Sequence, residues 1–223
     1  MLVRSDEGLP PWLKAAEQQL ALLEQSEQPY KTAATRIELL QNAVMRAKQE
    51  TDCTPGMIAK LQYGLAAAYL EHLSAQRTQQ MEEALQACEE ALQVYTQADY
   101  PYQYASVQIT RGSTYRERAM GVQRDNLEQA IACHREALSV FIEQDFPYEF
   151  AEALHGLGQT YQLRIEGERN ANIEQAIVCC REALNVRTLI DLPFEHAQTL
   201  QVLGTAYFRR VAGERRDNLG TSH

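Results

Sequence analysis

Basic residues are too few in this sequence to suggest a nucleic-acid partner. Twenty-one lysines and arginines stand against thirty aspartates and glutamates, which gives a formal net charge of −9 over 223 residues. Binding to a phosphate backbone depends on clustered basic side chains that release counterions. The sequence therefore predicts that the protein does not bind nucleic acid.

Long hydrophobic runs are absent as well. A helix that crosses a bilayer needs about 20 consecutive apolar residues, and no stretch of this sequence approaches that length. Residues 1–8 also lack the apolar core of a signal peptide. These two absences predict no membrane partner and a cytoplasmic location.

Cysteine is present, but never in the CxxC spacing of a zinc or redox site. The five positions are Cys53, Cys88, Cys133, Cys179 and Cys180. An odd number of cysteines without paired spacing favours reduced thiols over a disulfide framework, and it predicts no metal site.

Catalytic motifs are missing too, since no Walker loop, HExxH, GxSxG or nucleotide-binding glycine run occurs. Cys133 and His134 are the one adjacent thiol and imidazole, but successive residues of a helix point about 100° apart. These two side chains therefore cannot form the hydrogen-bonded couple that a nucleophile needs. We expect no cofactor, and a protein that is not an enzyme.

What the sequence does contain is one unit repeated every 46 residues. Three series share this period: Pro55, Pro101, Pro147 and Pro193; Tyr69, Tyr115, Tyr161 and Tyr207; Gly112, Gly158 and Gly204, with Ala66 in place of the first glycine. A fixed period of this kind predicts stacked supersecondary units that share one continuous core.

Each unit is predicted to be a pair of antiparallel helices. The first helix begins at the proline and runs about 20 residues to a glycine such as Gly167, which suits a left-handed C-cap. The second helix begins near Asn126 or Asn172, each interpreted as an N-cap. In the repeat over 101–146 the apolar stripe of this second helix is Leu127, Ala130, Ile131, His134, Leu138 and Phe141.

These patterns divide the chain into five parts. Residues 1–54 are predicted to be a degenerate N-terminal capping hairpin, 55–100, 101–146 and 147–192 to be complete repeats, and 193–223 to be an incomplete repeat. The incomplete repeat holds one helix, predicted over 193–211, without its hairpin partner. Gly158, between Leu157 and Tyr161, predicts a close approach by a neighbouring helix.

The residues Leu157, Gly158 and Tyr161, followed by Ala176 and Ala183, resemble the tetratricopeptide repeat. The units here are 46 residues long where the common repeat has 34, and in this they look like long bacterial arrays that accompany CHAT protease or signalling domains. The resemblance implies an all-α, right-handed superhelix of antiparallel helical hairpins. It also implies a protein-binding scaffold without catalysis of its own.

In such a scaffold the first helices of the units line a concave groove that holds a peptide or a partner domain. Counting around each helix from its buried positions gives the residues that face this groove. They are Lys60, Tyr63, Ser106, Ile109, Ser113, Arg116, Glu152, His155, Gln159, Gln162, Gln198, Gln201, Thr205 and Phe208. The alternative interpretation of these positions is a merely solvated surface.

Two further interpretations stay open. The unpaired helix at 193–211 could expose Leu200, Leu203 or Tyr207 and form a homo-oligomer, or the chain could be a regulatory array from a larger protease or signalling protein.

Loop arginines could form a basic ridge for an acidic partner, although pairing with helix-end carboxylates is favoured. They are Arg118, Arg124, Arg164, Arg169, Arg210, Arg215 and Arg216.

Overall fold

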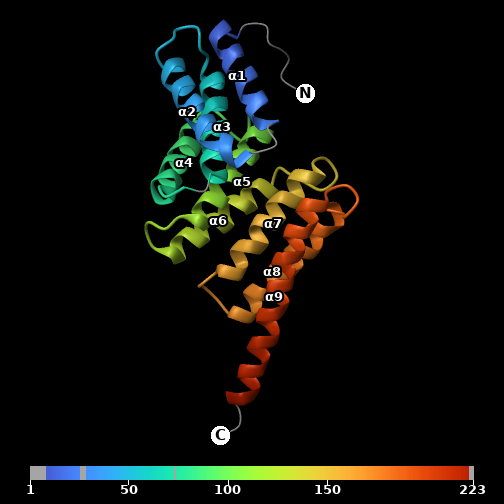
Figure 1. Ribbon diagram of the computed structural model, residues 1–223. Helices are drawn as coiled ribbons and strands as arrows, with labels where there is room; N and C mark the ends of the chain where they lie inside the picture. Colours follow the sequence, from blue (N-terminus) through green and yellow to red (C-terminus); the bar gives the residue numbers. More distant parts are fainter. Residues whose placement is uncertain (1–8, 26–28, 73, 221–223) are drawn as a thin grey trace. The chain divides into compact units, whose positions relative to one another are not determined.

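The regular structure of the chain is helical throughout the part that the computed structural model describes, which is residues 9–25, 29–72 and 74–220, without the side chains of 24, 29–31 and 211–220 (Figure 1). The helices are α1 (Pro11–Glu24), α2 (Pro29–Ala47), α3 (Pro55–Glu71), α4 (Arg77–Leu92), α5 (Pro101–Glu117), α6 (Gln123–Leu138), α7 (Pro147–Leu163), α8 (Arg169–Val186) and α9 (Pro193–Gly220). The predicted all-α class is confirmed.

The chain forms two compact units, Met1–Tyr100 and Pro101–His223, and the division falls at a predicted repeat boundary. Within each unit every helix packs against the next one in the chain, as expected of a helical-repeat solenoid. In the second unit α5 also contacts α7, and α7 contacts α9, while α6 and α8 do not meet. The helices α5, α7 and α9 therefore form one row, and α6 and α8 form another.

Prolines begin the first helix of each repeat, as predicted. Proline occupies the first turn of α3 and α7, where its missing N–H is not needed for a helical hydrogen bond. At α3 the preceding Thr54 completes the cap, because its hydroxyl accepts a hydrogen bond of 3.3 Å from the backbone N–H of Met57.

The predicted helix ends need correction. Gly121 and Gly167 do adopt positive φ, +79° and +76°, as glycine readily does. However, α5 ends at Glu117 and α7 at Leu163, so these glycines lie in the loops and do not cap the helices. In α9, by contrast, the helix continues past the predicted end near 211 to Gly220.

Asn126 and Asn172 are not N-caps, because α6 and α8 begin three residues earlier. Each asparagine instead holds the loop that precedes its helix. The Asn172 amide donates to the carbonyl of Glu166 (2.7 Å), and its oxygen accepts from Arg164 (3.2 Å). Asn126 makes the equivalent bonds to Met120 (2.8 Å) and Arg118 (3.3 Å).

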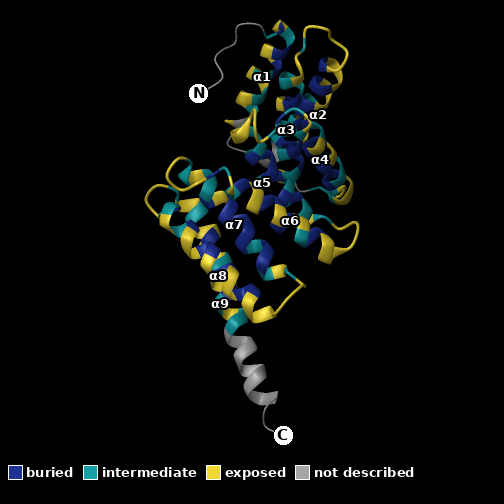
Figure 2. Ribbon diagram, turned by 180° about the vertical axis from the view of Figure 1, so that it is seen from behind, coloured by how far each residue is buried: buried dark blue, intermediate teal, exposed yellow. Residues whose placement is uncertain are grey.

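The predicted helix-to-helix contact at glycine is confirmed. A Cβ atom on Gly158 would lie 2.9 Å from the Sγ of Cys180, so α7 and α8 approach closely there. A Cβ on Gly112 would lie 3.0 Å from the His134 ring, and one on Gly156 would lie 2.4 Å from it. His134 therefore occupies a slot between α5 and α7 whose two walls are glycines. Figure 2 shows that α7 is buried along most of its length.

Candidate functional site

The predicted groove residues of the second unit lie on the row formed by α5, α7 and α9, but several of them are hydrogen-bonded to neighbouring helices. Arg116 donates to Gln159, which joins α5 to α7. The Gln162 amide donates to the carbonyl of Val202 (2.6 Å), and Arg209 donates to the carbonyl of Gln162 (2.6 Å). These bonds join α7 to its neighbours in the row, and a hollow of about 480 Å³ remains beside Gln162 and Arg209.

His155 was expected to face the groove, but it is only 7 % exposed. Its Nδ1 lies 3.2 Å from the hydroxyl of Thr199 on α9. Arg187 donates to the same hydroxyl (3.2 Å) and to the carboxylate of Glu152. Two predicted groove residues, Glu152 and His155, therefore belong to a partly buried network that joins α9 to α7.

The other predicted positions of this unit differ in exposure. Ile109 packs against the core around Phe141, and Ser106 donates to the backbone carbonyl of Tyr102 (2.9 Å). Ser113 is half-buried. The four positions on α9 are exposed: Gln198, Gln201, Thr205 and Phe208.

In the first unit the same predicted surface forms a real pocket. Here α1 and α3 each pack against α2, their backbones stay apart from each other, and a pocket of about 470 Å³ lies between them. We call it the α1–α3 pocket. Its lining is Glu17, Leu20, Ala21, Arg36, Leu40, Lys60, Leu61, Tyr63, Gly64, Ala67 and Glu71.

The α1–α3 pocket has an apolar floor and a charged rim. Leu40 and Leu61 are buried beneath it, and Gly64 supplies no side chain to fill it. At the rim Lys60 pairs with Glu17 (2.6 Å), and Arg36 pairs with Glu71 (2.9 Å). An occupant would thus contact apolar atoms in the centre and charges of both signs at the edges.

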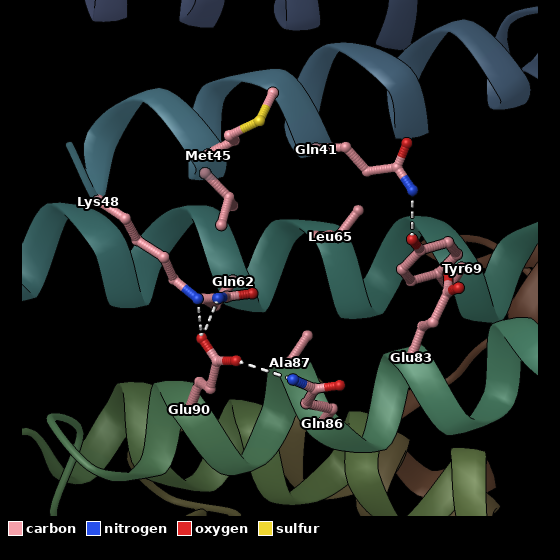
Figure 3. A pocket seen from close by; sticks show the side chains of 11 residues that line it. Gln41, Met45, Lys48, Gln62, Leu65, Tyr69, Glu83, Gln86, Ala87 and Glu90 are labelled. Atoms are coloured by element: carbon pink, nitrogen blue, oxygen red, sulfur yellow. Dashed lines mark hydrogen bonds and ion pairs between the residues drawn. The ribbon is translucent and has the colours of Figure 1, made fainter.

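A second hollow of about 360 Å³ lies on another side of α3, between α2 and α4 (Figure 3). The polar side chains that line it donate hydrogen bonds to other residues of the chain. Glu90 accepts from Lys48 (2.5 Å), from Gln62 and from Gln86 (3.2 Å). At the other end the Gln41 amide donates to the Tyr69 hydroxyl (2.7 Å). These side chains tie three helices together, which the sequence analysis did not foresee.

Arg187 is the functional-looking residue that the sequence analysis missed. It is 2 % exposed, and it stands where the two preceding repeats have the buried aromatic residues Phe141 and Tyr95, 46 and 92 positions earlier. The repeat alignment therefore carried the signal: an arginine stands at a core position. Its charge is met by Glu152, whose side chain is about half exposed.

Three of the arginines that were predicted to lie in loops pair with carboxylates. Arg164 binds Glu128 through two nitrogens (2.8 and 2.9 Å), which lowers the pKa of that carboxyl. Arg124 pairs with Glu166 (3.2 Å), and Arg210 with Glu174 (3.4 Å). Arg215 and Arg216 lie outside the residues with described side chains.

Burial lowers the reactivity of three cysteine thiols and leaves the His134 ring without a hydrogen-bond partner. Desolvation raises the pKa of Cys133 and Cys180 to about 11 and that of Cys179 to about 12, so the reactive thiolate is disfavoured. Both ring nitrogens of His134 are buried without a hydrogen-bond partner. No cluster of three metal-ligating side chains occurs among the residues described.

Comparison with known proteins adds no family to this picture. No protein-family model matches the chain, and no curated protein matches it. Within the described residues, none of the helices combines the length and the apolar character needed to cross a bilayer.

Proposed function

We propose that the protein is a non-catalytic interaction scaffold that binds a peptide segment of a partner in the α1–α3 pocket. The observation that carries this proposal is the pocket between α1 and α3, whose backbones stay apart and are bridged at the rim by Lys60 and Glu17, whereas α5 and α7 pack directly against each other. Lys60 and Tyr63, two predicted groove residues, line the pocket. The resemblance to the tetratricopeptide repeat supports the same proposal.

The pocket favours an amphipathic occupant. A large apolar side chain would cover Leu40, Leu61 and Gly64, where burial gains about 25 cal/mol for each Å² removed from water. Charged residues on either side of that anchor would meet the Lys60–Glu17 and Arg36–Glu71 pairs. Such rim charges contribute mainly to orientation and association rate.

A peptide-display library on the immobilised protein tests this proposal. Gly64→Leu should fill the pocket without breaking the fold, because a Cβ at Gly64 meets only Leu40 at an ordinary 3.5 Å and leucine favours a helix over glycine. We expect enriched peptides to carry one large apolar residue flanked by charges, and to bind Gly64→Leu at least tenfold more weakly than wild type.

Gly56→Leu is the matched control. It makes the same exchange on α3, near Thr54 and outside the pocket lining, and it should leave peptide affinity unchanged. Peptides that bind Gly64→Leu as tightly as wild type would show that the pocket is not the binding site.

A further inference from the structure

Three residues of α9 lie uncovered on one face of the helix. Ala197, Leu200 and Gly204 follow an i, i+3, i+7 spacing, which places them on a single stripe. All three are exposed, Leu200 by 45 %. A Cβ atom on Gly204 would meet no heavy atom within 4 Å. We call these residues the open face of α9.

The corresponding residues of α7 are covered. Ala151 and Leu154, 46 positions earlier, are 0 % and 4 % exposed. Gly158, which corresponds to Gly204, has α8 directly against it, with Cys180 Sγ at 2.9 Å and the Ala176 carbonyl oxygen at 3.4 Å from its ideal Cβ. The repeat thus shows what packs on such a face: the following helix of the α8 type.

The rest of α9 is fixed in place. Ala206 is fully buried, and Leu203 and Tyr207 pack against the core formed by α7 and α8. Bonds from Gln162 to the Val202 carbonyl and from Arg209 to the Gln162 carbonyl hold α9 beside α7. The exposed apolar stripe therefore lies on a helix that these contacts hold in place.

The residue at the centre of the open face matches α7 and no earlier repeat. On α3 and α5 the equivalent positions are Gln62 and Gln108, which donate to glutamates of the following helix. On α7 and α9 they are Leu154 and Leu200. An occupant of α9 must therefore offer apolar and small side chains there, as α8 does to α7.

We propose that the open face of α9 is a docking site for an amphipathic helix of the α8 type, supplied by a partner polypeptide that is not a second copy of this chain. Such a helix carries small residues where α8 has Ala176, Cys180 and Ala183, and isoleucine where it has Ile173 and Ile177. The small residue opposite Gly204 lets the two backbones approach as α7 and α8 do. This site is separate from the α1–α3 pocket and goes beyond the function proposed above.

The chain's own α8 supplies the probe. A fluorescent peptide of residues 168–187 is titrated with the full chain under reducing conditions, and binding is followed by anisotropy. We expect saturable one-to-one binding that Gly204→Leu weakens at least tenfold. Because nothing lies near Gly204, this variant should fold as wild type does, and it should be no less helical.

Thr205→Leu is the matched control, since it adds the same side chain at the next position, about 100° around the helix. Thr205 is exposed, and its hydroxyl bonds only within its own helix, to the Gln201 carbonyl. Peptide affinity should be unchanged. Equal weakening by both variants, or no saturable binding at millimolar peptide, would overturn the proposal.

A crosslink tests the register. The 2.9 Å between a Gly158 Cβ and Cys180 Sγ is close to the separation of about 3 Å across a disulfide. With oxidised glutathione as oxidant, Gly204→Cys should therefore form a disulfide with Cys180 of a peptide carrying Cys179→Ser, and Thr205→Cys should not. If the chain alone is a dimer that Gly204→Leu dissociates, a second copy covers this face and the proposal is wrong.

Discussion

His134 is a polar residue at a core position where the other repeats have cysteine, at Cys88 and Cys180. Its ring fits because Gly112 and Gly156 leave room on both sides, yet neither ring nitrogen has a hydrogen-bond partner. Burial, with the nearby charge of Arg116 and the neighbouring His155, lowers its pKa from 6.5 to about 3. The residue therefore stays neutral in the folded chain.

This neutrality predicts loss of stability in acid. The unfolded chain takes up a proton at His134 below about pH 6.5, while the folded chain does not until about pH 3. The contribution is complete above pH 6.5 and is lost as the pH falls toward 3, with a slope of about 1.4 kcal/mol per pH unit for each such histidine. His155, whose pKa is also lowered to about 3, adds to it.

Urea unfolding between pH 7.5 and 5 measures this slope. We expect His134→Cys, which installs the residue of the neighbouring repeats, to reduce the slope even if it lowers stability at pH 7.5 by leaving a cavity. A slope identical in the two proteins would show that His134 does not carry the effect.

At the scale of helix pairs, the glycine series decides how closely each first helix meets its second. A Cβ would lie within about 3 Å of a side chain at Gly112 and Gly158, whereas Gly204 faces open space. The same residue type thus has a packing role in α5 and α7, and no intramolecular one among the residues described around α9.

The variants Gly158→Leu and Gly204→Ala should therefore shift stability in opposite directions. Gly158→Leu overpacks the contact with Cys180 and should cost roughly 1–3 kcal/mol. Gly204→Ala meets nothing and removes glycine's penalty in a helix, so it should stabilise by about 0.5–1 kcal/mol. Chemical denaturation followed by circular dichroism gives both values. An unchanged midpoint for Gly158→Leu would contradict the packing described here.

The sequence period predicted the starts of the first helices and the core stripe well, because prolines and apolar spacing act locally. The loops were predicted less well. Asn172 resembles an N-cap by type and position, but its partners are Arg164 and the Glu166 carbonyl, which lie across a loop and carry no spacing rule. The prediction that His155 faces the groove was wrong for a similar reason. Counting around a helix gives the direction in which a side chain points, but not the distance to the next helix.

At the scale of the whole molecule, all five cysteines are free thiols, and four of them are buried. Cys53 alone is half-exposed; its pKa is raised by partial burial and by the nearby carboxylates of Asp52 and Glu50. The reduced state predicted from the odd count fits this arrangement. Reactivity toward a thiol reagent should thus report on the integrity of both units.

We expect one thiol to react with Ellman's reagent in the native protein within minutes, and five in denaturant. Cys53→Ser should abolish the native reaction and leave four thiols in denaturant. Rapid reaction of more than one thiol in the native protein would contradict the burial of Cys88, Cys133, Cys179 and Cys180.

The slot that holds His134 also restricts how modules of this chain could be shuffled. One wall belongs to its own repeat and the other, Gly156, to the repeat that follows. A tandem duplication of 101–146 would present Thr110 in place of Gly156, and the threonine side chain would collide with the imidazole. The packing of His134 therefore requires that the repeat over 101–146 be followed by one with glycine at the position of Gly156. An array without this glycine could not pack its core at that junction.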